Sequence, residues 1–97
     1  METSEKYLPI GTVVLLKEAT KRIMITGFCA VSGSNKEKMY DYSGCLYPEG
    51  LLSSEQVALF DHNQIDKIYH LGYRDEEEIE FKNRLKTFTN SSEQSNI

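Results

Sequence analysis

The hydrophobic pattern of this chain changes once, near Arg74, and that change constrains the fold more than any other feature. Before it, apolar residues come in short runs rich in Val, Ile and Tyr, as is typical of β-strands. After it, Phe81, Leu85 and Phe88 recur at helical spacing and form one apolar stripe. Several short strands followed by one terminal helix indicate an α+β domain.

Turn residues divide the first part of the chain into short predicted strands. These strands are expected at 10–16, 22–31, 40–42, 57–60 and 67–73. Gly27 inside the second strand indicates a bulge or a sharp bend, residues 32–38 form a polar hairpin loop, and Gly44 is expected in a turn. Because the connections are short, the sheet is predicted to be antiparallel and strongly curved, as an SH3-like barrel or half-barrel.

The terminal helix is predicted over residues 75–88. Asp75 is a suitable N-cap, and Glu78 completes the pattern of a capping box. The apolar stripe of the helix is expected to lie over an open edge or end of the sheet. The predicted organisation is a flexible N-terminus at 1–6, a single domain at 7–89, and a flexible tail at 90–97.

The composition is that of an ordinary soluble chain, and its charge disfavours anionic partners. The 97 residues are 39% hydrophobic and carry a formal net charge of -4, which phosphate backbones and anionic lipids repel. No apolar run approaches the roughly 20 residues that cross a bilayer, and the polar, acidic N-terminus lacks the basic start of a secretory signal. The expected location is the cytoplasm, where Cys29 and Cys45 are reduced.

No arrangement of residues in the sequence predicts a catalytic or metal site. His62 and His70 are the only candidate imidazole bases, and no recognisable nucleophile motif accompanies them. Asp61, His62, Asp66 and His70 supply metal-ligating atoms, but their spacing does not bring two strong ligands together. Asp61 is instead expected to cap a helical turn at 62–65. The chain is therefore predicted to be no enzyme and to hold no cofactor and no metal.

A small nucleic-acid-binding barrel is an alternative, because basic residues gather on neighbouring predicted loops. They are Lys17, Lys21, Arg22, Lys36 and Lys38. Against this alternative stand the net charge and the acidic run at 75–80. The simpler interpretation is that these side chains are solvated loop tips.

The start of the helix carries the candidate partner-binding residues. Capping and the helix dipole alone explain the acidic run, but Glu76, Glu77 and Glu80 also present carboxylates that suit a basic protein partner. Ile79 falls on the outer face of the helix, where it is an ordinary exposed residue or one anchor of a contact. An exposed strand edge offers a second kind of contact, to a partner strand or to a second copy in a homodimer.

The order of three motif groups resembles the family catalogued as domain of unknown function 4176. The groups are 7–16 with 21–27, 40–45 with 47–50, and 60–66 with 71–78. The resemblance covers about residues 7 to 82. Its motif residues are Gly, Pro and aromatic residues, which are expected at turn and core positions, so it carries over no catalytic residue.

The resemblance implies a function through the genes that surround such proteins. Members of the family occur in Gram-positive bacteria, beside genes for type VII secretion and for toxins with an N-terminal LXG domain. The implied function is an accessory protein that binds such a toxin and stabilises or targets it. An immunity protein that binds the C-terminal domain of the toxin is an alternative, and a small hydrolase built on His62 and His70 is another.

Overall fold

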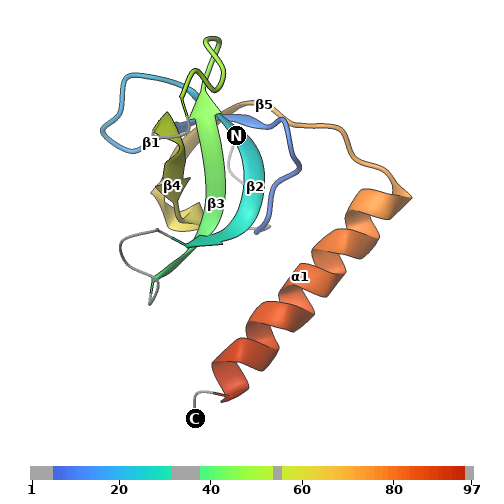
Figure 1. Cartoon of the computed structure of the whole chain (residues 1–97). Helices are drawn as coiled ribbons and strands as arrows, with labels where there is room; N and C mark the ends of the chain where they lie inside the picture. Colours follow the sequence, from blue (N-terminus) through green and yellow to red (C-terminus); the bar gives the residue numbers. More distant parts are fainter. Residues whose placement is uncertain (1–5, 32–37, 54–55, 96–97) are drawn as a thin grey trace.

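The computed structural model describes residues 6–31, 38–53 and 56–95 (Figure 1). They form one five-stranded antiparallel sheet followed by one helix, which confirms the predicted α+β class. The elements are β1 (Val13–Leu16), β2 (Ile23–Val31), β3 (Met39–Leu46), β4 (Ala58–Phe60), the 3-10 turn η2 (His62–Gln64), β5 (Ile65–His70) and α1 (Glu76–Ser95). Residues 1–5 of the predicted flexible N-terminus and 32–37 of the predicted hairpin loop lie outside the described residues.

The sheet is open and strongly curved. Its strand order is β4-β3-β2-β1-β5, so β4 and β5 form the two edges, and the half-barrel form of the prediction is correct. Figure 1 shows β2 and β3 bending together through the sheet. The pairing of β2 with β3 shifts register between Ile25 and Gly27, which confirms the predicted bulge at this glycine.

The core forms between the segment ahead of β1 and the inward-facing side chains of β1 to β4. Its buried members are Leu8, Val14, Ile23, Ile25, Tyr42 and Phe60. Ile65 and Ile68 of β5 are partly buried and pack against this cluster. Alternate residues of the strands supply these contacts, as expected for a sheet with one buried face.

Gly44 lies inside β3 and not in a turn, so this prediction was wrong. A Cβ at this position would be 2.6 Å from Cγ2 of Ile23 and 2.7 Å from the carbonyl oxygen of Met24. The glycine therefore marks close packing between strands, a role that the sequence does not distinguish from a turn.

The start of α1 follows the predicted cap, but its end does not follow the prediction. Asp75 caps the helix, because its Oδ1 accepts the N–H of Glu78 at 2.9 Å. The Glu78 carboxylate lies near Arg74 and Lys82, so it does not make the expected return contact of a capping box. The helix continues to Ser95 instead of ending at 88, because no Gly or Pro interrupts it and Ser, Asn and Gln lower helix propensity only modestly. Within the described residues, no helix has the length and apolar character of a membrane span.

Candidate functional site

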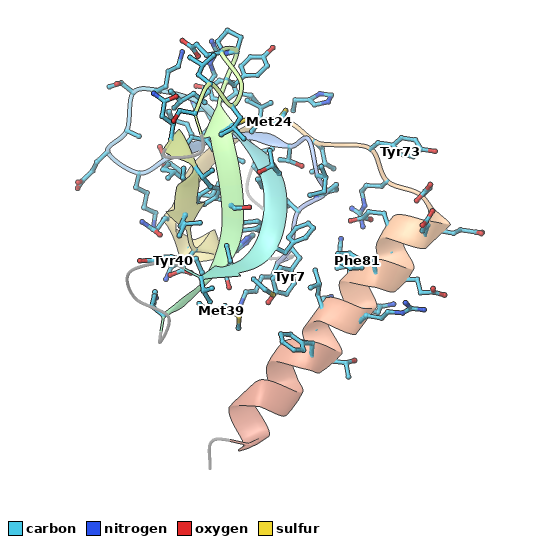
Figure 2. The ribbon with its side chains drawn as sticks, viewed as in Figure 1. Tyr7, Met24, Met39, Tyr40, Tyr73 and Phe81 are labelled. Carbon is cyan, nitrogen blue, oxygen red and sulfur yellow. The ribbon has the colours of Figure 1, made fainter. Side chains whose placement is uncertain are left out.

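A groove of about 400 Å³ lies between the sheet and α1. Figure 2 shows Tyr7 on the sheet side and Phe81 on the helix side of this groove. The residues that line it are Tyr7, Ile10, Thr26, Gly27, Phe28, Tyr73, Glu78, Phe81, Lys82 and Leu85. Most of these side chains are apolar or aromatic, which is typical of a surface that excludes water when it is occupied.

The apolar stripe of α1 lies only partly against the sheet. The Phe81 ring is 6.0 Å from the Phe28 ring of β2, and Leu85 is half-buried. Phe88 is 53% exposed, and Figure 1 shows the second half of α1 running past the end of the sheet. The expectation that all three stripe residues cover the sheet is therefore wrong for Phe88, because the helix leaves the globule before that turn.

The strand β2 has an edge that no other described strand covers. On the β3 side it is paired from Ile23 to Val31. On the other side, β1 pairs with Ile23 and Met24, and Ile25 completes the contact through hydrogen bonds with Gly11 and Thr12. Among the residues that the structure describes, none pairs with residues 26–31 on this side, and α1 stands beyond it (Figure 1).

The groove contains one carboxylate with an unusual environment. The Glu78 side chain is only 17% exposed, and its Oε1 is buried with no hydrogen-bond donor among the described residues. Arg74 Nε lies 3.6 Å from this oxygen, and Lys82 Nζ lies 3.9 Å from Oε2. The two cations offset the charge of the Glu78 carboxylate, so this wall of the groove carries an ion-paired cluster and not an uncompensated negative charge.

Two residues beside the groove have left-handed backbone conformations. Tyr7 has a φ of 65° and Cys29 has a φ of 53°, and Cys29 Sγ is 4.0 Å from the Tyr7 hydroxyl. For residues with a Cβ this conformation costs about 1–2 kcal/mol each. Strained residues of this kind are concentrated at binding sites, where the surrounding structure holds them in place.

Tyr42 holds the N-terminal segment in position at the groove. Its hydroxyl oxygen accepts the N–H groups of Tyr7 at 2.9 Å and Leu8 at 3.0 Å. It is also 2.8 Å from Nδ1 of His62, which therefore accepts the hydroxyl proton. Burial raises the pKa of Tyr42 to about 12, although the N–H groups of Leu8 and Tyr7 act in the opposite direction.

The stability of the fold is expected to fall between about pH 10 and pH 12 because of Tyr42. In this range the unfolded chain has lost the Tyr42 proton and the folded chain still binds it, so rising pH favours unfolding. The stabilisation that protonated Tyr42 contributes is complete below the ordinary pKa of 10.0 and is lost as the pH rises through about 12. Urea unfolding across this range measures the effect, and a Tyr42→Phe variant with the same pH dependence would contradict the assignment.

The predicted partner-binding residues lie on α1 but outside the groove. Glu76, Glu77, Ile79 and Glu80 are all exposed, and none of them lines it. Glu80 forms an exposed ion pair with Arg84 at 3.1 Å. Their role in binding stays a prediction. The sequence did not single out the groove, because its residues have ordinary core and motif character until α1 is positioned.

The candidate catalytic and metal-ligating residues do not come together. His70 is exposed at the end of β5, whereas His62 and Asp61 belong to a network that joins η2 to β3. In this network Asp41 accepts the backbone N–H of His62, and Asp61 accepts the backbone N–H of Asp41. The described residues contain no group of three His, Cys, Asp or Glu side chains arranged to hold a metal.

The basic residues that suggested nucleic-acid binding are partly neutralised. Lys21 pairs with Glu49 at 2.6 Å, and Lys38 pairs with Asp61 at 3.2 Å. Arg22 stacks on the rings of Tyr47 and Tyr69, and Lys36 lies outside the described residues. The two lysines therefore present little uncompensated charge to a phosphate backbone.

The fold defines a small α+β domain with an open sheet, a long terminal helix and an apolar groove between them. The model of the family described as domain of unknown function (DUF4176) matches residues 7–81, and the chain belongs to this family. The match includes the whole sheet and the groove-lining part of α1 up to Phe81. No curated protein and no solved structure matches the chain.

Proposed function

We propose that this protein is a non-enzymatic accessory protein of a type VII secretion locus, which binds an LXG-type toxin and stabilises or targets it. The family match supports the family alone, and the locus is what the resemblance in the sequence implies. The observation that supports binding to a protein is the open aromatic surface of the groove and α1. Phe81, Phe88 and Tyr73 are about half exposed or more, and clustered exposed aromatic residues are typical of protein interfaces.

The projecting part of α1 also supports a protein partner. In proteins most of the stability of a helix comes from packing of its apolar face against another surface. The first turns of α1 contact Phe28 of β2, but the helix then continues past the sheet with Phe88 exposed. A partner that covers this stripe would supply the missing packing. The proposed role places the protein in the cytoplasm, where it would meet the toxin before export.

An immunity role is the second candidate, and the charge of α1 favours it. Glu76 and Glu77 are exposed, and together with Ile79 and Glu80 they offer an acidic surface with one apolar anchor. Such a surface suits the basic C-terminal domain of a nuclease toxin. An adaptor and an immunity protein differ in the toxin domain that they bind.

We expect the protein to co-purify with the LXG toxin encoded beside its gene when the two are co-expressed. An adaptor should retain a truncated toxin that consists of the N-terminal LXG domain alone. Retention of the C-terminal domain alone would instead identify an immunity protein. Failure to co-purify with any product of the neighbouring genes would contradict both roles. An unrelated protein of similar net charge serves as the control bait.

A further inference from the structure

We propose that an acidic segment of the protein partner binds the surface formed by Arg22, Tyr47, Lys67 and Tyr69, named here the Arg22 platform. A carboxylate of that segment would bind the Arg22 guanidinium, and its apolar neighbours would pack on the two tyrosine rings. None of the four residues lines the groove. The inference deepens the proposed function, since it rests on the protein-binding role and names the chemistry of the bound segment.

Two tyrosine rings contact the Arg22 guanidinium. Tyr47 directly follows β3 and Tyr69 belongs to β5, so the two rings come from opposite sides of β2 in the strand order. The guanidinium carbon is 5.2 Å from the centroid of the Tyr47 ring and 5.9 Å from that of the Tyr69 ring. Both distances are typical of cation–π contacts. A guanidinium held by its faces keeps its N–H donors in its plane, which is the geometry that binds a carboxylate through two hydrogen bonds.

The platform carries two positive charges that no ion pair offsets. Lys67 Nζ is 5.7 Å from the Tyr69 ring that Arg22 also contacts, and no ion pair among the described residues includes Arg22 or Lys67. The Glu49 carboxylate is bound to Lys21 at 2.6 Å. This hydrogen bond is the main cause of the lowered pKa of Glu49, and the charge of Arg22 contributes less. Two cations therefore share one ring, and an anion is the group that would offset their charges.

The platform is exposed enough to contact a partner. Its two tyrosine side chains are 38% and 51% exposed. Ile23 is buried in the core, so alternation along the chain places Arg22 and Met24 on the outward face. Figure 2 shows Met24 at the upper end of the sheet, apart from Phe81 and the groove. Because Tyr and Arg are among the residues that dominate the energy of protein interfaces, the occupant is expected to carry an apolar residue beside its carboxylate.

A nucleic acid is a less suitable anion for this surface. Sites for single strands follow the backbone with a continuous basic groove, whereas the platform has two cations and the neighbouring Lys21 is paired with Glu49. The formal net charge of -4 also repels a polyanion beyond the platform. A short acidic segment needs only the charges that the platform supplies, so the observations favour a carboxylate of a protein.

A second copy of this chain is also a less suitable occupant. The start of α1 presents Glu76 and Glu77 beside the exposed Ile79, which is the required chemistry. However, two chains that each carry a formal net charge of -4 repel each other. A different protein whose acidic residues are confined to one segment does not meet this repulsion.

The experiment selects short random peptides, displayed on phage, against the full-length protein. We expect the selected peptides to carry Asp or Glu next to an apolar or aromatic residue. Synthetic copies should bind the wild type, and Arg22→Gln should weaken this binding about tenfold or more. Arg84→Gln is the matched control, because Arg84 is an arginine of α1 outside the platform with a side chain that is 75% exposed. It should change binding less than about twofold.

Three further measurements distinguish the platform from a general attraction between charges. Arg22→Lys keeps the charge but not the paired donors, so it should weaken the peptides about threefold or more. Lys67→Gln removes the second charge at an exposed position and should weaken them to a similar extent, which keeps the test decisive if Arg22→Gln fails to fold. Replacement of Asp or Glu in the peptides by Asn or Gln should remove the difference between the wild type and Arg22→Gln.

Several outcomes would overturn the inference. They are a selection that enriches no acidic peptide, equal binding by Arg22→Gln, and a loss with Arg84→Gln as large as that with Arg22→Gln. Tighter binding of an oligothymidine single strand, which displaces the peptides, would assign the surface to nucleic acid. Salt-sensitive self-association that Arg22→Gln abolishes would assign it to a second copy.

The toxin separates failure of this inference from failure of the proposed function. If the toxin co-purifies equally well with Arg22→Gln, the accessory role stands and the platform inference fails. If acidic peptides bind as expected but no toxin does, the proposed locus function fails instead.

Discussion

Gly72→Ala is expected to destabilise the fold by about 3 kcal/mol or more, since it would force a methyl group into main chain that cannot move aside. A Cβ on Gly72 would overlap the carbonyl oxygen of Ile10 and stand 2.9 Å from the carbonyl carbon of Ile10 and 3.1 Å from the nitrogen of Thr12. The Gly72 N–H also donates to the buried Thr12 hydroxyl at 3.0 Å. This contact joins the chain after β5 to the segment ahead of β1, so separating the two would open the domain.

Gly50→Ala is the control for this prediction. Gly50 has a φ of 81°, but a Cβ there would meet no atom within 4 Å. This variant should therefore lose only the conformational term of about 1–2 kcal/mol. Urea unfolding of both variants measures the difference. Equal losses would mean that the close approach of Gly72 to Ile10 does not limit stability.

Tyr42→Phe is expected to cost about 3 kcal/mol, because it removes the acceptor of two buried N–H groups and the donor to His62. The hydroxyl serves Tyr7, Leu8 and His62 at 2.9, 3.0 and 2.8 Å. The ring itself stays in the core beside Phe60, at a centroid distance of 5.2 Å, so the loss comes from the polar contacts. Because Tyr7 lines the groove and the Tyr42 hydroxyl holds it there, the variant should also weaken the binding of any partner in the groove.

Tyr40→Phe, on the same strand, tests whether the loss of stability is specific to the hydroxyl of Tyr42. Lys38 Nζ lies 5.1 Å from the Tyr40 ring, and no described residue forms a hydrogen bond with the Tyr40 hydroxyl. Removal of the Tyr40 hydroxyl should change the unfolding free energy by less than about 0.5 kcal/mol. Thermal unfolding compares the two variants, since 1 kcal/mol corresponds to a shift of roughly 4–8 °C in a domain of this size. A Tyr42→Phe variant as stable as Tyr40→Phe would show that the anchor contributes little.

The elements of this fold were predictable where their signals are local. Alternating and β-branched runs place the strands, Gly27 marks the bulge, and Asp75 caps the helix, because each of these signals acts through neighbouring residues. The end of α1 was not predictable in this way, since the chain after 88 contains no residue that stops a helix. Gly44 was misplaced because a glycine at a turn and a glycine under a packed side chain look the same in one sequence.

The groove could not be predicted from any local pattern in the sequence. Phe81, Leu85 and Phe88 form a stripe in any helix of this sequence, but how much of it is buried depends on where the linker between β5 and α1 directs the helix. Ile79 was recognisable because helical spacing places it on the opposite side of the helix from that stripe. The candidates Glu76, Glu77 and Glu80 were recognisable as part of the acidic run at the start of the helix.

The sequence by itself determined the class of the domain, its strands and the capped start of its helix, because hydrophobic periodicity and turn chemistry act over a few residues. It also excluded any recognisable catalytic motif. Only the tertiary structure decided that β1 stops pairing with β2 at Met24, that α1 stands beside the part of β2 that no described strand covers, and that Glu78 lines the groove between them. Strand register and helix direction arise from packing between distant segments, and these two features together make the groove.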